Sequence, residues 1–145
     1  MRVFFDTNVL VYLFDADNEI KKDMACSRFE AEASAGRALL STQVLQEFYV
    51  SVTRKLAVPL APEIAEAIVR DFSLLPIVAI DTERVLAAIQ RSRMLKRSFW
   101  DALIIEAALA GGADCLLTED MQHGQMIEGL RIENPFLSIP QKRPA

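Results

Sequence analysis

The stretch Arg2-Val3-Phe4-Phe5-Asp6 opens the chain with β-forming residues and ends on a carboxylate. A short apolar run of this kind, without polar alternation, is typical of a strand buried on both faces of a parallel sheet. Similar runs follow at residues 38–41, 76–80 and 114–118, and a weaker one at 130–132 indicates an edge strand. The pattern therefore predicts a mostly parallel sheet of four to five strands.

Segments with the length and periodicity of helices separate these runs. Helices are expected at residues 8–13, 19–34, 43–56, 62–74, 82–95 and 99–110. Several of them follow residues that suit a helix N-cap, namely Thr7 or Asn8, Thr42, Asp81 and Ser98. Strands and helices that alternate in this way predict an α/β fold with helices on both faces of the sheet.

Length and composition fit one globular domain. The 145 residues are 52% hydrophobic and 25% charged, which is ordinary for such a domain. We assign residues 1–134 to the domain and expect the proline-containing residues 135–145 to be a flexible tail. Neither a secretory signal nor an apolar run of about 20 residues is present, so we expect a cytoplasmic protein.

The two cysteines and the single histidine do not suggest a zinc site. Cys26 and Cys115 are far apart in the sequence, and His123 cannot complete a ligand set with them. We expect both cysteines to be buried apolar residues and His123 to lie in a loop rather than to act as a general base.

Five acidic residues fall where the predicted strands end or where helices begin. Asp6 follows the first strand, and Glu47 lies one turn into the helix after the second. Asp101 lies in the first turn of the helix capped by Ser98, and Glu119 and Asp120 follow the fourth strand. Ligands of open parallel sheets bind at the carboxyl ends of the strands, so Asp6, Glu47, Glu119 and Asp120 are expected at one rim. Asp101 joins them if its helix starts at that rim, which the sequence alone does not decide.

A rim of carboxylates suits Mg²⁺ or Mn²⁺, which prefer oxygen ligands. Such an ion polarises a phosphoryl oxygen and activates an attacking water, which is the chemistry of phosphodiester hydrolysis. Each residue also has a structural interpretation. Asp101 could complete a capping box, Glu47 could lie on a solvated helix face, and Asp120 could form an Asx-turn.

The net charge of −4, from 16 basic and 20 acidic residues, argues against a nonspecific nucleic-acid binder. Four basic residues nevertheless gather directly before Asp101, namely Arg91, Arg93, Lys96 and Arg97. They could form a phosphate track beside the metal site, or they could complement the dipole of a helix C-terminus.

Four motifs resemble those of PIN-domain nucleases, in the same order along the chain. They are residues 3–10 around Asp6, Gln46-Glu47-Phe48, residues 99–104 around Asp101, and residues 117–121 around Asp120. The resemblance extends from Arg2 to about Ile132 and implies a Rossmann-like three-layer α/β/α fold.

The resemblance also implies Mg²⁺- or Mn²⁺-dependent cleavage of RNA by Asp6, Glu47, Asp101 and Asp120, with Asn8 and Thr118 in support. We expect Asp6 and Asp101 to hold the principal ion, and Asp120 and Glu47 to complete a second site or to bind through water. The adjacent Glu119 leaves the fourth position ambiguous, and we favour Asp120.

The size of the chain is similar to that of the VapC toxins of toxin–antitoxin pairs, which implies an RNA substrate, a homodimer and a small cognate antitoxin. Apolar residues on the predicted helices, such as Val50, Leu56 and Leu60, would suit a dimer or antitoxin surface.

Two other functions fit parts of the sequence. A haloacid-dehalogenase-type phosphatase also begins with a strand and an aspartate, but Asn8 stands where its second acid would be. A non-catalytic interaction module with a vestigial acidic site is the other alternative, although all four acidic positions are present.

Overall fold

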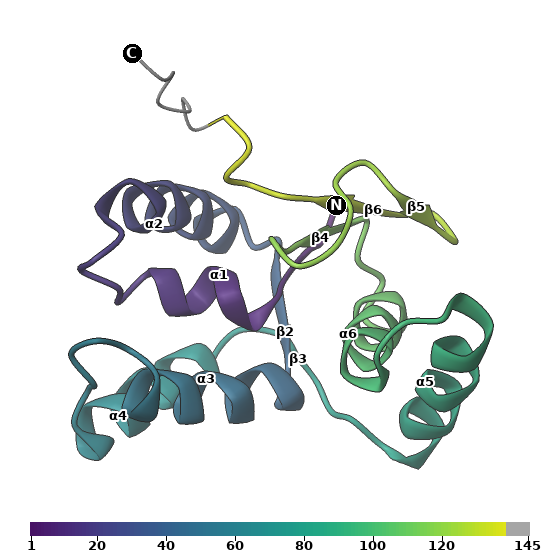
Figure 1. Cartoon of the computed structure of the whole chain (residues 1–145), viewed down its shortest axis with the longest axis horizontal. Helices are drawn as coiled ribbons and strands as arrows, with labels where there is room; N and C mark the ends of the chain where they lie inside the picture. Colours follow the sequence, from purple (N-terminus) through teal and green to yellow (C-terminus); the bar gives the residue numbers. More distant parts are fainter. Residues whose placement is uncertain (139–145) are drawn as a thin grey trace.

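A six-stranded sheet forms the centre of the computed structural model, which describes residues 1–138 (Figure 1). Its strands are β1 (Val3–Phe5), β2 (Ala38–Ser41), β3 (Ile77–Val78), β4 (Cys115–Leu117), β5 (Met126–Ile127) and β6 (Leu130–Glu133). They lie in the order β3-β2-β1-β4-β6-β5, and all neighbours are parallel except β5 and β6. The prediction of a mostly parallel sheet is therefore confirmed.

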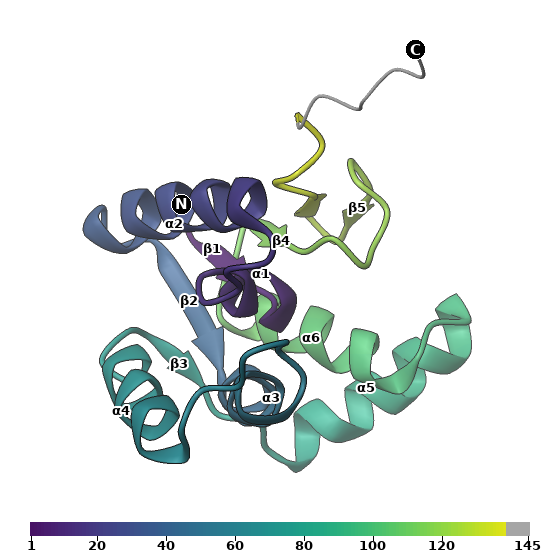
Figure 2. The same ribbon diagram turned by 60° about the vertical axis from the view of Figure 1, so that its left-hand side comes forward.

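Six helices in the described part of the chain cover the two faces of this sheet. They are α1 (Thr7–Tyr12), α2 (Glu19–Ser34), α3 (Thr42–Arg54), α4 (Pro62–Phe72), α5 (Thr82–Leu95) and α6 (Phe99–Ala110). Figures 1 and 2 show α1 to α4 on one side of the sheet and the α5–α6 pair on the other. This is the predicted α/β/α arrangement.

The sheet differs from the prediction at one edge. Residues 130–132 were expected to form an edge strand, but β6 lies between β4 and β5. The edge is β5, a two-residue strand that turns back on β6 through Glu128, at a φ of 49°, and Gly129, at a φ of 86°. So short a strand, of which only Ile127 is buried, has no apolar pattern to mark it in the sequence.

Two of the expected helix caps are wrong by one residue. Asp6 rather than Thr7 or Asn8 is the N-cap of α1, and Ser41 rather than Thr42 caps α3. Asp6 and Ser41 both have extended backbone and directly precede their helices. The strand β1 therefore leads straight into α1, and β2 leads straight into α3. Asp81 and Ser98 cap α5 and α6 as predicted.

The core lies between the sheet and the helices, and some of the expected surface residues contribute to it. Phe136 is only 5% exposed and its ring packs edge-on against Tyr12, with ring centroids 5.0 Å apart. Phe136 thus packs against the core although it falls within the predicted tail, residues 135–145. Residues 139–145 lie outside the described part, so flexibility of the tail stays a prediction. Leu56 and Leu60, expected at a binding surface, are partly buried against the core, whereas Val50 is 45% exposed.

The two cysteines differ in their burial. Cys115 is buried in β4 as predicted, but Cys26 on α2 is only partly buried. Among residues 1–138 no helix is long and apolar enough to cross a membrane.

Candidate active site

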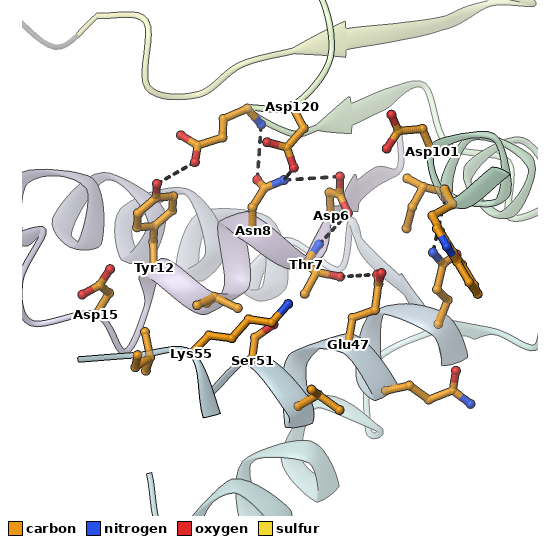
Figure 3. A pocket seen from close by; sticks show the side chains of 18 residues that line it. Asp6, Thr7, Asn8, Tyr12, Asp15, Glu47, Ser51, Lys55, Asp101 and Asp120 are labelled. Carbon is orange, nitrogen blue, oxygen red and sulfur yellow. Dashed lines mark hydrogen bonds between the residues drawn. The ribbon is translucent and has the colours of Figure 1, made fainter. Parts of the chain in front are cut away.

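A pocket of about 700 Å³ opens at the carboxyl ends of β1 and β4, between α1, α3 and the start of α6 (Figure 3). All four predicted carboxylates line it. The lining residues are Asp6, Thr7, Asn8, Val11, Tyr12, Asp15, Gln43, Gln46, Glu47, Val50, Ser51, Lys55, Leu56, Trp100, Asp101, Ile104, Glu119 and Asp120.

Asp6 is the most buried of these carboxylates, with 5% of its surface exposed. It accepts hydrogen bonds from the backbone N–H of Thr7 at 2.7 Å and from the Thr118 hydroxyl at 2.8 Å. Burial raises its pKa to about 7, and the nearby Glu47 and Asp120 charges add to that effect, although the two hydrogen bonds oppose it. The site therefore holds a carboxylate whose charge is poorly compensated by the protein itself.

Asn8 links Asp6 to Asp120. Its amide nitrogen lies 3.4 Å from Asp6 Oδ2, 3.0 Å from Asp120 Oδ2 and 3.2 Å from Thr118 Oγ1. The Thr118 hydroxyl, which donates to Asp6, also accepts from the backbone N–H of Asp120 at 3.1 Å. Asn8 and Thr118 thus connect the ends of β1 and β4 and place the two aspartates in one hydrogen-bonded network.

Glu47 and Asp101 come from the helices on either side of this network. The Thr7 hydroxyl donates to Glu47 Oε1 at 2.9 Å, which ties α3 to the start of α1. The Asp101 backbone N–H donates to Ser98 Oγ at 3.1 Å, but its carboxylate makes no hydrogen bond or ion pair with any described residue. In a full capping box the Asp101 carboxylate would also accept from the Ser98 backbone N–H, and the described residues show no such bond. The Asp101 carboxylate is therefore free to face the pocket (Figure 3).

The neighbouring acids Glu119 and Asp120 have different surroundings. Glu119 accepts from the Tyr12 hydroxyl at 2.5 Å and forms an ion pair with Lys21 at 2.9 Å, and this contact raises the pKa of the Lys21 ammonium. The Asp120 side chain faces Asn8 instead. Since Glu119 already has a cation and a donor, Asp120 is the acid of this pair that is available to a ligand.

The four carboxylates line one pocket, but they do not converge as tightly as we expected. Among residues 1–138 no three acidic, histidine or cysteine side chains are close enough to form a ready-made cation site. The donor chemistry nevertheless fits a hard divalent cation, because the acids offer oxygen atoms and Asp6 carries an uncompensated buried charge. A bound cation would supply that compensation.

The basic cluster that was expected to guide phosphates lies outside the pocket, and two of its members have other partners. None of Arg91, Arg93, Lys96 and Arg97 lines the pocket. Arg91 pairs with Glu106 at 2.6 Å and with Glu128 at 2.5 Å, and Arg97 donates to Gln125. These contacts attach the segment around β5 to α5 and α6. A phosphate track formed by this cluster stays a prediction.

Other residues of the pocket were not anticipated. Gln43, Ser51 and Lys55 line it together with Glu47, and Trp100 lines it next to Asp101. Three residues of α3 and its C-cap, Lys55, are spaced four apart in the sequence, which places them on one face of the helix. This spacing is visible in the sequence. It predicts pocket residues only once Glu47 is known to face the site.

Comparison with known families identifies the fold. The profile of the PIN domain matches residues 3–126. The chain belongs to the PIN-domain family. This membership excludes the haloacid-dehalogenase family as the origin of the opening strand and its aspartate.

Solved structures similar to this PIN domain include members of toxin–antitoxin complexes. The DNA-bound VapBC of Salmonella typhimurium has a TM-score of 0.65 at 24% identity, covering 93% of this chain and 98% of that one. A toxin–antitoxin complex from Klebsiella pneumoniae has a TM-score of 0.66 at 19% identity, covering 92% and 97%.

The Mycobacterium tuberculosis VapC20, described as a sarcin-ricin loop cleaving toxin, has a TM-score of 0.59 at 19% identity, covering 79% of this chain and 86% of that one. The TM-scores establish a shared fold, and at these identities they establish the fold alone. Comparison with curated protein sequences gave no match.

Proposed function

We propose that this PIN domain is a metal-dependent endoribonuclease and the toxin of a toxin–antitoxin pair. The observation that carries the proposal is the pocket in which Asp6, Glu47, Asp101 and Asp120 line one opening, with Asp6 buried and its pKa raised. The choice of RNA as the substrate draws on the described activity of the similar VapC20 toxin.

The four acids have distinct roles in this proposal. Asp6 and Asp101 would hold the principal Mg²⁺ or Mn²⁺, and Glu47 and Asp120 would complete its surroundings. The bound ion would supply Lewis acidity toward the phosphodiester and a lowered pKa for the attacking water. Asn8 and Thr118 keep Asp6 and Asp120 oriented through their hydrogen bonds.

The first test is cleavage of a labelled RNA by the purified protein in Mg²⁺, in Mn²⁺ and in EDTA. Cleavage should need the divalent ion, and Asp6→Asn should abolish it while the circular dichroism spectrum stays unchanged. Asp71→Asn is the matched control, because Asp71 is an exposed carboxylate on α4 outside the pocket. Full activity of Asp6→Asn, or cleavage that persists in EDTA, would refute the proposal.

Calorimetry separates the enzyme from a non-catalytic interaction module. Titration with Mg²⁺ or Mn²⁺ should give a binding isotherm that Asp6→Asn and Asp101→Asn weaken. Absence of divalent binding to the wild-type protein would favour the module.

The proposed partners are a small cognate antitoxin and a second copy of the chain. The VapBC complexes with similar folds motivate the antitoxin. A small protein encoded beside the gene should copurify with this chain and suppress its RNA cleavage. Light scattering on the purified chain measures whether it is a dimer.

A further inference from the structure

We propose that Trp100 and Lys55 hold the RNA substrate at two ends of the pocket, Trp100 by stacking on a nucleobase and Lys55 by pairing with a phosphate. This inference rests on the proposed ribonuclease function. It assigns substrate-binding roles to two residues outside the carboxylate set.

Trp100 presents an aromatic surface directly beside the acids. Its side chain is 61% exposed although it lines the pocket and precedes Asp101. Its carbonyl accepts a hydrogen bond from Gln43 Nε2 at 3.3 Å, and its ring packs edge-on against Phe99 with centroids 5.1 Å apart. The Trp100 backbone is thus tied to α3, and its ring contacts Phe99 while most of the residue stays exposed. An exposed aromatic ring beside an active site is what aromatic platforms offer to unstacked bases.

Lys55 lies at the C-terminal end of α3, on the helix face that lines the pocket. Gln43, at the start of that face, contacts Trp100, and Glu47 follows one turn later. Lys55 is eight residues beyond Glu47, which corresponds to about 12 Å along a helix axis. In Figure 3 the Lys55 ammonium lies on one side of Asp6 and Glu47, and Asp101 lies on the other.

Lys55 is the basic side chain that the pocket offers to an anion. Among the described residues that line the pocket it alone is a cation. Its backbone N–H donates to the Ser51 carbonyl at the end of α3, but its ammonium forms no hydrogen bond or ion pair within residues 1–138. The proposed ion offsets the carboxylates only where it binds, so a phosphate further along the strand needs another positive charge to offset the acidic pocket. Arg91 and Arg97 are engaged with Glu106 and Gln125, so they do not supply that charge.

Both residues also have a simpler structural explanation, which the experiments must separate from RNA binding. Lys55 follows the last turn of α3, where a cation stabilises the helix dipole. Trp100 could serve as a contact in a dimer. Neither role predicts a specific response to the bases or phosphates of an RNA.

The fluorescence of the protein offers a direct test of stacking, because Trp100 is the only tryptophan in the chain. The Asp6→Asn variant, which prevents cleavage, is titrated with a uridine hexanucleotide and with an abasic hexanucleotide of the same backbone. The uridine oligonucleotide should quench the emission along the binding curve measured by anisotropy, and the abasic one should not. Binding without quenching, equal quenching by both, or no binding at all would overturn the role of Trp100.

The salt dependence of binding tests Lys55. Each phosphate contact to a single strand contributes about 0.7 to the slope of log affinity against log salt concentration. In the same Asp6→Asn background, Lys55→Gln should lower the magnitude of that slope by about 0.7, and Lys55→Arg should restore it. Arg54→Gln is the matched control, since Arg54 lies in the last turn of α3, is exposed and does not line the pocket.

An equal change of slope in the Lys55→Gln and Arg54→Gln variants, or no change in either, would overturn the role of Lys55. These outcomes are distinguishable from failure of the proposed function. If the wild-type protein cleaves RNA with a divalent ion but the quenching and slope results are negative, only the binding assignment fails. If RNA binds as described but the wild-type protein never cleaves it, the ribonuclease function fails.

Discussion

Asp6 is expected to destabilise the metal-free protein at neutral and alkaline pH. Its pKa is raised from 3.8 to about 7 in the folded protein. Between about pH 4 and pH 7 the unfolded chain has released a proton that the folded protein still keeps. The free energy of unfolding therefore falls by about 1.4 kcal/mol per pH unit in this range, about 4 kcal/mol in all, and levels off above pH 7.

The Asp6→Asn variant should remove this penalty. Asparagine is as good an N-cap as aspartate, so α1 keeps its cap while the buried charge disappears. The new amide nitrogen cannot accept the hydrogen bonds that Oδ2 receives from Thr118 and Asn8, which offsets part of the gain. Urea denaturation in EDTA should show the variant to be more stable than the wild type at pH 8, by up to about 4 kcal/mol, with a much smaller difference at pH 4. A variant that is no more stable than wild type at pH 8, or that keeps the same pH dependence, would refute the reasoning.

A divalent ion should stabilise the wild type and have little effect on the Asp6→Asn variant. Added Mg²⁺ binds the folded site and should raise the stability of the wild type at pH 8. The effect should weaken at pH 6, where a proton competes for Asp6. Asp6→Asn should show little gain, and Asp71→Asn should respond like the wild type.

Three further changes test the packing and the ion pairs by urea denaturation. Phe48→Ala should cost about 3–5 kcal/mol, because a fully buried ring is replaced by a cavity; a loss under 1 kcal/mol would contradict this. Gly111→Ala should cost about 1–3 kcal/mol, since a Cβ at that position would lie 2.4 Å from Leu39 Cδ2 in the core; a neutral effect would show that Leu39 moves aside easily. Arg91→Gln should cost about 3–5 kcal/mol because it leaves the buried Glu106 carboxylate unpaired, and adding Glu106→Gln should recover part of the loss.

The alternation of apolar runs and amphipathic segments was sufficient to predict most of the fold. The strands β1, β2 and β4 are buried runs of Val, Phe, Leu and Ala with little polar interruption, and burial on both faces is what such runs require. The strand β5 could not be predicted, because its pairing depends on the turn at Glu128 and Gly129 and on contacts with α5 and α6.

The candidate site could be predicted only in part for a related reason. Asp6, Glu47 and Asp120 follow or leave strand ends, and parallel strands bring those ends to one edge. The bonding of Glu119 to Lys21 and Tyr12 depends on how α1 and α2 pack, which no local pattern encodes. The same limit explains the basic cluster, whose Arg91 and Arg97 have partners 15 and 28 residues away.

The pairing of β1 with β4 has a consequence for folding during synthesis on the ribosome. Residues 3–5 are synthesised before their neighbours in the sheet, residues 115–117, and Asp120 follows those. Because Asn8 bonds Thr118 and Asp120, a nascent chain lacks this half of the pocket until residues 115–120 have been translated. The acidic site therefore cannot assemble while β4 is still missing or inside the exit tunnel.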